Sequence, residues 1–387
     1  MRRAKFGLVY MTICVVAVLS LAASLPSNSR NCVSPIEELV SNSICRVDSN
    51  YQSESELHYV RPLELTVDRN NNLYISAIEK WAVFKVDPAG TITTMVGNGK
   101  PGRLREGAAA TAVGVRPLAL AFDDEGSLYV ADADSFRVFK VLATGTISFV
   151  AGNGTEGHAG DGGPALAANL YAPTGLAFGP DKSLLILDGA DNRIRKVSPD
   201  GIIRTIAGTG EKGYGGDGGP ATAASLNSPS DIAVDRAGNL LVADDFNYRI
   251  RKIDNRGTIT TVAGNGMSGG YKDEAMPAIR TPMSAPLSIA FDDNGDLFIA
   301  DGSIRRLDKW GVITTVAGHG VGKTGLANQR GFETETTLIL PFSITVDHEG
   351  NLYAAEWAVR YSKTRVRKIN PAGIITTVYT DAPPPAN

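Results

Sequence analysis

Few residues in this chain have the chemistry of a catalytic or metal site. The histidines stand singly at four distant positions, His58, His158, His319 and His348. A protein zinc site brings three or four nitrogen or sulfur ligands to one point, and this scatter does not favour one. No serine–histidine–aspartate or cysteine–histidine set can be assembled from the spacing either. The sequence therefore offers acids, rather than histidines, as candidates for chemistry.

Two of these acids occupy equivalent places in a recurring pattern. Glu64 stands two residues after Pro62, and Asp231 stands two residues after Pro229. At the same place in the other copies the residues are Ala119, Gly175, Ser288 and Ser343. Two carboxylates that face each other could share a cation with the serines and water. Calcium takes six to eight oxygen ligands, so two carboxylates are few for a strong calcium site.

The pattern that places these acids repeats six times. The copies begin at Pro62, Pro117, Pro173, Pro229, Pro286 and Pro341, at spacings of 55 to 57 residues. Each copy holds four short runs rich in Val, Ile and Tyr, separated by turn residues such as Asp235–Asn239. Such runs predict antiparallel strands joined by hairpins.

A single four-stranded copy cannot bury both of its faces, so the copies must stack side by side. The first and last copies have ordinary sequences instead of capping sequences. A closed ring is therefore favoured over a linear solenoid, because closure leaves only short, protected edges. The sequence predicts an all-β fold, a single six-bladed β-propeller of four-stranded antiparallel blades over residues 61–380, followed by a tail at 381–387.

Two connections between copies carry the string Gly-Asp-Gly-Gly-Pro-Ala, at Gly160–Ala165 and Gly216–Ala221. The string Asp-Asn-Arg-Ile-Arg-Lys-Val follows at Asp191–Val197. With these motifs the chain resembles the NHL-repeat family, which includes secreted bacterial propellers and the teneurin propeller. The resemblance extends from about Arg61 to Thr380 and implies the same six-bladed fold. It does not by itself define an activity, since propellers host many unrelated functions.

Two repeated features have simple structural interpretations. The acids that end the second strand of each copy are expected to accept backbone N–H groups of the following turn; they are Asp132, Asp188, Asp244, Asp301 and Glu356. The Gly-Asp-Gly-Gly-Pro-Ala loops are expected to form a tight turn and one helical turn, with Pro164 or Pro220 at its first position. Neither feature requires a ligand.

The first 24 residues predict export. Arg2, Arg3 and Lys5 precede an apolar run from Phe6 to Leu21, and Ala22–Ser24 offers small residues for cleavage. This pattern is typical of a signal peptide, although the run is long enough to remain as a membrane anchor. Either way the rest of the chain is expected to be secreted, periplasmic or otherwise extracytoplasmic.

The segment 25–60 lies outside the repeats and contains Cys32 and Cys45. An isolated cysteine pair in an oxidising compartment is a candidate disulfide. Without Arg2, Arg3 and Lys5, the 38 basic residues of the chain fall to 35 against 41 acidic residues, a net charge of about −6. Such a surface has no general attraction for phosphate backbones, so nucleic acid is not the expected partner.

The long connections between copies, about 20 residues each, share one rim with the turns between the second and third strands. Long loops on a compact repeat are often functional, and this rim carries aromatic side chains of the kind enriched at interfaces. The expected ligand-binding face comprises Glu64, Tyr171, Tyr214, Asp231, Phe246, Tyr248 and Tyr271. The alternative is that these aromatics only pack the loops onto the rim.

These observations favour a monomeric, non-enzymatic binding module, without a cofactor, for a protein, peptide or glycan. The alternative hypothesis is a metal-dependent hydrolase or lyase, because lactonase-like propellers carry acids at the axial mouth. Its site would be centred on Glu64 and Asp231, with calcium as the cofactor. A lyase of the kind that binds zinc through three histidines is excluded, because His158 and His348 are expected on opposite rims.

Overall fold

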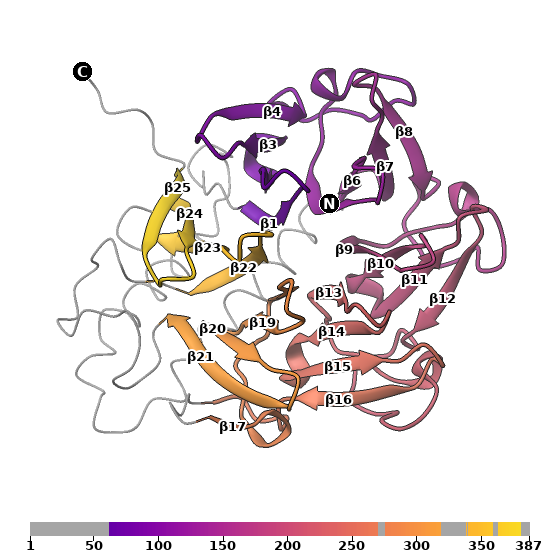
Figure 1. The fold of residues 1–387 in the computed structure, drawn as a ribbon. Coiled ribbons are helices and arrows are strands. Elements are labelled where there is room, and N and C mark those ends of the chain that lie inside the picture. Colours follow the sequence, from indigo (N-terminus) through magenta and orange to yellow (C-terminus); the bar gives the residue numbers. More distant parts are fainter. Residues whose placement is uncertain (1–61, 270–274, 319–337, 339, 359–362, 381–387) are drawn as a thin grey trace, which may run out of the picture.

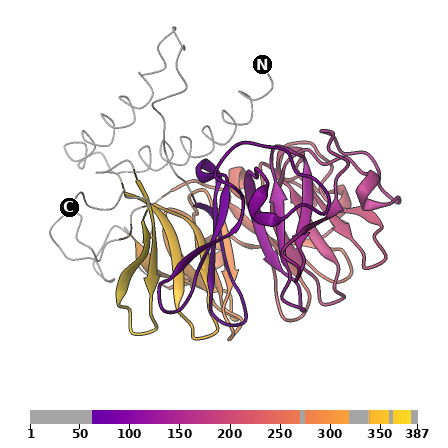
Figure 2. The same ribbon diagram turned by 90° about the horizontal axis from the view of Figure 1, so that it is seen from above.

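The computed structural model describes residues 62–269, 275–318, 338, 340–358 and 363–380. These residues form six antiparallel sheets arranged as a ring, with the first strand of each sheet nearest the centre (Figure 1). Seen from the side, the ring is a disc with loops on both faces (Figure 2). The predicted six-bladed propeller of four-stranded blades is confirmed.

The first three blades follow the chain without crossovers. Blade 1 contains β1 (Pro62–Val67), β2 (Leu73–Ala77), β3 (Ala82–Val86) and β4 (Ile92–Val96). Blade 2 contains β5 (Pro117–Phe122), β6 (Leu128–Asp132), β7 (Arg137–Val141) and β8 (Ile147–Ala151). Blade 3 contains β9 (Pro173–Phe178), β10 (Leu184–Asp188), β11 (Arg193–Val197) and β12 (Ile203–Ala207).

The last three blades repeat this order. Blade 4 contains β13 (Asp231–Val234), β14 (Leu240–Asp244), β15 (Arg249–Ile253) and β16 (Ile259–Ala263). Blade 5 contains β18 (Ser288–Phe291), β19 (Leu297–Ala300), β20 (Ser303–Leu307) and β21 (Val312–Gly318), with β17 (Met276–Pro277) paired to β21 as a fifth strand. Blade 6 contains β22 (Pro341–Val346), β23 (Leu352–Ala358), β24 (Lys363–Ile369) and β25 (Ile375–Thr380).

Small and branched apolar side chains fill the space between neighbouring blades. Between blades 2 and 3, Ala119 and Ala131 face Leu176 and Ile186, and all four are at most 5% exposed. The alanines come from the inner strands, where converging blades leave little room. This packing explains why the repeat needs neighbours, since each blade buries its faces only against the next one.

The ring closes through side-chain and backbone contacts between blades 1 and 6. Each of these two blades is built from four consecutive strands, so no described strand passes from one end of the chain into the other blade. Near the axis the backbone N–H of Leu65 donates to Ser343 Oγ at 3.1 Å. On the rim of the β1–β2 and β22–β23 turns, Asn71 Nδ2 donates to Glu349 Oε1 at 3.2 Å.

Short 3₁₀ turns end the long connections, as in η4 (Ala165–Ala167) and η6 (Ala221–Ala223). The predicted helical turn is therefore present, but Pro164 and Pro220 precede it in extended conformation instead of occupying its first position. The reason is that each proline also bridges to the outer hairpin of the next blade, as Pro164 does to Ile202. The other 3₁₀ turns are η2 (Ile78–Lys80), η3 (Ala110–Ala112), η5 (Gly189–Asp191), η7 (Asp245–Asn247) and η8 (Ala278–Arg280).

Several predictions from the sequence concern residues outside the described ranges. These are the signal peptide or anchor, the Cys32–Cys45 disulfide, the tail and Tyr271. No helix of the described residues is long and apolar enough to cross a membrane.

Candidate binding rim and axial cavity

The aspartate of each Gly-Asp-Gly-Gly-Pro-Ala loop fastens the connection to the blade that follows it. Asp217 accepts hydrogen bonds from Arg251 Nη2 at 2.8 Å and from the backbone N–H of Thr261 at 3.2 Å. Asp161 does the same one blade earlier with Arg195 Nη2, at 2.7 Å, and the backbone of Thr205. The loop is therefore a clamp between a connection and the outer strands, a role that the sequence analysis did not predict.

The arginines that these clamps hold are fully buried. Arg195 and Arg251 are 0% exposed, and Arg251 also donates to Asp244 Oδ2 at 3.2 Å. Although partial burial opposes it, the hydrogen bonds from Thr261, Arg251 and Tyr214 lower the pKa of Asp217. Beneath the rim loops of blades 3 and 4 there is thus a buried arginine in each blade, paired with the loop aspartate.

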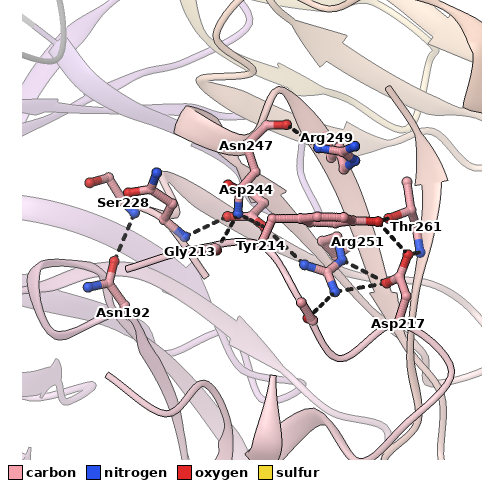
Figure 3. A network of polar contacts seen from close by, with 12 residues as sticks. Asn192, Gly213, Tyr214, Asp217, Ser228, Asp244, Asn247, Arg249, Arg251 and Thr261 are labelled. Carbon is pink, nitrogen blue, oxygen red and sulfur yellow. Dashed lines mark hydrogen bonds and ion pairs between the residues drawn. The ribbon is translucent and has the colours of Figure 1, made fainter. Parts of the chain in front are cut away.

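Tyr214 contacts the loop aspartate, Asp217, and two arginines of the third strand (Figure 3). Its hydroxyl donates to Asp217 Oδ2 at 2.9 Å, and its ring lies 3.8 Å from the Arg249 guanidinium carbon and 4.9 Å from that of Arg251. The residue is nevertheless 46% exposed. An aromatic side chain whose rotamer is already fixed loses little entropy when a partner covers it.

Blade 3 carries different side chains at the same places. Asp191 accepts from Arg193 Nη1 at 2.5 Å and lies 3.5 Å from His158 Nδ1. Tyr171, in the connection that enters blade 3, is 36% exposed, and the neighbouring Glu156 carboxylate raises the pKa of its hydroxyl. The sector of blade 3 is therefore acidic where that of blade 4 is aromatic and cationic.

The four predicted aromatics that lie within the described residues are exposed unequally. Tyr171 and Tyr214 are the most exposed, whereas Phe246 and Tyr248 are half-buried. Tyr248 packs against the core between blades 4 and 5 and has a left-handed backbone at the end of its turn. Tyr248 therefore packs its turn onto the rim, which is the alternative that the sequence analysis left open, and is not an exposed anchor.

The acids that end the second strands differ in their partners. Asp132 accepts the backbone N–H of Ser135 in the turn that follows, as predicted, and also that of Arg116 in the connection before its blade. Asp301 and Glu356 form ion pairs with third-strand arginines.

Asp188 and Asp244 instead accept N–H groups of the long connection that precedes their own blade. Asp188 accepts from the backbone of Tyr171 and Ala172, at 3.0 and 2.6 Å, and Asp244 accepts from Asn227 at 2.8 Å. The cause is tertiary, since the connection enters the blade directly beside the strand end. Burial raises the pKa of Asp132, Asp188 and Asp301 to about 6.

Glu64 and Asp231 line one cavity of about 220 Å³ on the axis. They belong to blades 1 and 4 and so approach it from opposite sides of the ring. Its other lining residues are apolar or neutral, and none of them is basic. Burial and the negative charge of Asp231 hold the pKa of Glu64 well above its ordinary value, and burial raises the pKa of Asp231 to about 6.

Both acids face a neighbouring blade. Asp231 Oδ2 accepts from the backbone N–H of Ile289 in blade 5 at 2.8 Å. The backbone of Leu120 in blade 2 acts to lower the pKa of Glu64, against the larger effect of burial. The serine at the same place in blade 5, Ser288, accepts from the next blade as Asp231 does. The place two residues after the blade proline therefore has a structural role around the axis. Among the described residues no group of three metal-ligating side chains is present.

Asp245 is an ionisable residue that the sequence reasoning missed. It is 0% exposed, and neither of its carboxylate oxygens has a hydrogen-bond partner. Burial and the charge of Asp244 hold its pKa well above the ordinary value. The sequence did hold a signal for it, because the same place is occupied by the uncharged residues Ile78, Ala133 and Gly189 in the first three blades. An acid at this place in blade 4 departs from that pattern.

Comparison with protein families gives this architecture a name. The model of the teneurin NHL domain matches residues 141–215 and 209–273, which include both Gly-Asp-Gly-Gly-Pro-Ala loops. About a third of the chain thus matches the teneurin NHL domain. The NHL-repeat family that the sequence motifs indicated is supported by this match and by the teneurin relatives.

Curated relatives of this NHL propeller include much longer proteins. Teneurin-3 of Danio rerio is 28% identical over 270 residues, which cover 60% of this chain and 10% of the relative. The chloroplastic protein SUPPRESSOR OF QUENCHING 1 of Arabidopsis thaliana is 26% identical over 256 residues, which cover 62% of this chain and 24% of the relative. The chain thus spans at most about a quarter of the length of these relatives.

Solved structures with the same fold as this NHL propeller come from proteins of different kinds. An auxiliary nutrient binding protein from Bacteroides thetaiotaomicron aligns with a TM-score of 0.54 at 14% identity, over 83% of this chain and 70% of that one. A gluconolactonase from Xanthomonas campestris aligns with a TM-score of 0.52 at 14% identity, over 78% and 84%. At such identities the likeness shows the fold alone.

Proposed function

We propose that this NHL propeller is an exported, non-enzymatic binding module, a monomer without a cofactor that engages a protein partner, or else a peptide or glycan, through the rim of its long connections. The observation that carries the proposal is Tyr214, an aromatic side chain 46% exposed and fixed by Asp217, Arg249 and Arg251. Rigid aromatics of this kind are enriched among the residues that dominate binding energy. The similarity to the teneurin NHL domain supports an interaction module.

Further contacts would come from the other predicted aromatics of this rim. Tyr171 lies one blade away with 36% of its surface exposed, and Phe246, in the turn after β14, is half-buried. Tyr248 and Tyr271 belong to the same proposed face. Export rests on the charged and apolar segment at the N-terminus, with Arg2, Arg3 and Lys5 before the apolar run.

The proposal is tested by capture of partners from the extracytoplasmic fraction of the producing cells. The purified mature chain is immobilised beside Tyr214→Ala and the control Trp310→Ala. Trp310 is the better control because it is 77% exposed and lies in the β20–β21 turn, on the opposite rim. We expect one retained species that Tyr214→Ala loses and Trp310→Ala keeps. Equal retention by all three chains would contradict a rim centred on Tyr214.

The second candidate is a metal-dependent hydrolase or lyase at Glu64 and Asp231. The observation in its favour is that both acids line one cavity without a basic residue in its wall. Against it, Asp231 already accepts a hydrogen bond from the neighbouring blade. Thermal melts in EDTA and with calcium restored would decide, since a ligand of the folded state raises the midpoint. A rise that Asp231→Asn abolishes would favour the enzyme, and an unchanged midpoint would count against it.

A further inference from the structure

The connection between β4 and β5, residues 97–116, differs in charge from the equivalent connections of the next two blades. It contains Lys100, Arg103, Arg105 and Arg116 against the single acid Glu106, a formal charge of +3. The connection at 152–172 contains Glu156 and Asp161 and no Lys or Arg, a charge of −2. The connection at 208–228 has Glu211, Lys212 and Asp217, a charge of −1. One sector of an otherwise acidic molecule is therefore basic.

The basic connection has a defined shape. Asn98 Nδ2 donates to the carbonyl of Ala112 at 3.1 Å, which ties its two ends together. Gly102 and Gly114 cross so closely that a Cβ on Gly114 would lie 2.2 Å from the Gly102 nitrogen. Leu104 is partly buried against the core between blades 1 and 2. The chain on either side of Leu104 is thus held in place, and its charged side chains do not have to be ordered from a flexible loop.

The charges of this connection have little compensation. Lys100, Arg103 and Arg105 are exposed, and no residue in the described part of the chain forms an ion pair with them. Glu106 instead accepts the backbone N–H of Phe149 at 2.7 Å. Only Arg116 has an acidic neighbour, Asp134, at 3.5 Å.

Blade 2 also differs from the next two blades in its interior. In blades 3 and 4 the loop aspartates, Asp161 and Asp217, bind the buried guanidinium groups of Arg195 and Arg251. In blade 2 the place of that arginine is taken by Phe139, which is 0% exposed. Blade 2 therefore has no buried arginine at this place, whereas Lys100, Arg103 and Arg105 of its connection are exposed.

We propose that the β4–β5 connection docks a short acidic segment of a protein partner, with Arg103 and Arg105 as the main contacts and Lys100 beside them. Guanidinium groups bind carboxylates in paired hydrogen bonds. A long anionic polymer fits less well, because the neighbouring connection is acidic and the whole chain has a net charge of −3. This inference rests on the proposed function, since it names the chemistry of the partner on the same rim.

The test uses a fluorescently labelled peptide of ten glutamates and the whole mature chain, with binding followed by fluorescence anisotropy. The variant is Arg103→Glu/Arg105→Glu. The control is Arg204→Glu/Arg256→Glu, which makes the same charge change at two exposed residues of blades 3 and 4 outside the rim loops. Thermal melts establish that both variants are folded. We expect the first variant to weaken binding about tenfold or more and the control to change it about twofold or less, and we expect salt to weaken binding by screening.

Other outcomes would overturn the inference. These are no binding of the peptide, an equal loss in both variants, or tighter binding of sulfated dextran or single-stranded DNA than of the peptide. The partner captured in the Tyr214 experiment separates this inference from the proposed function. If Tyr214→Ala loses that partner while Arg103→Glu/Arg105→Glu keeps it, the binding module stands and the acidic-segment inference fails. Loss in both variants supports both.

Discussion

Blades 3 and 4 have nearly the same rim scaffold and present different chemistry on it. Both have a loop aspartate that holds a buried arginine, and in both the first arginine of the third strand packs against a loop glycine. In blade 3 that arginine, Arg193, is neutralised by Asp191, with His158 beside it. In blade 4 Asn247 replaces the acid, and Arg249 stacks under Tyr214 instead.

The difference separates the residues that support the rim loops from those that a partner could contact. Asp161 and Asp217, or Arg195 and Arg251, do the same work in the two blades, and that work is internal. The places that differ are His158 against Tyr214, which are both exposed, and Asp191 against Asn247, whose side chains are largely buried beside the first arginine of the third strand. A binding surface built on a repeat can change there without loss of the clamp that supports it.

The largest expected effect is on the buried arginines. Arg251→Ala leaves Asp244, which is 0% exposed, without its cationic partner, and we expect a loss of about 3–5 kcal/mol in the free energy of unfolding. Arg195→Ala should cost less, because its partner Asp161 is half exposed and Asp188 keeps the N–H groups of Tyr171 and Ala172. Urea denaturation measures both values. Equal losses would show that the two clamps are energetically the same.

The next two substitutions, at the same place in blades 4 and 3, are expected to change the free energy of unfolding in opposite directions. Asp245→Ala removes a buried, unpartnered carboxyl group, and blade 2 already has Ala133 at this place. We expect it to stabilise the fold by about 1–3 kcal/mol at pH 7. Gly189→Ala in blade 3 should destabilise, because its Cβ would lie 2.4 Å from Thr174 Oγ1. Denaturation of the two variants beside the parent chain tests this opposition, and a destabilised Asp245→Ala would contradict it.

The same carboxyl group gives a dependence on pH. The pKa of Asp245 is raised in the folded state, so its favourable contribution is present at low pH and is lost as the pH rises towards the folded-state pKa. The advantage of Asp245→Ala should therefore be smallest near pH 4 and grow as the pH increases. The measurement is the difference in unfolding free energy between variant and parent from pH 4 to 8. A constant difference would mean that the pKa of Asp245 is the same in the folded and the unfolded chain.

The smallest expected effect on stability concerns the exposed rim. Tyr214→Ala removes two stacking contacts with arginine and a hydrogen bond, and we expect a cost of about 0.5–2 kcal/mol. His158→Ala, at the same place in blade 3, should leave the midpoint of a thermal melt nearly unchanged because the residue is mostly exposed. A larger loss for His158→Ala than for Tyr214→Ala would reverse the comparison.

The sequence determined the fold because its signal is repeated six times in register. The blade starts, the four strands of each blade, the closed ring and the NHL family follow from that periodicity. It also located the rim loops and placed Glu64 and Asp231 on opposite sides of the axis. Each of these depends on local turns and on alternating apolar residues, which a linear sequence records directly.

Only the tertiary structure decided what the individual side chains do. Asp188 and Asp244 serve the connection before their blade, and Tyr248 packs inward while Tyr214 stays exposed. The burial of Asp245 without a hydrogen-bond partner also needed the structure, as did the exposure of Arg103 and Arg105 without an ion pair among the described residues. These outcomes depend on contacts between residues some 15 to 60 positions apart in the chain. Their partners are brought together by the closed ring, and residue type and spacing do not specify them.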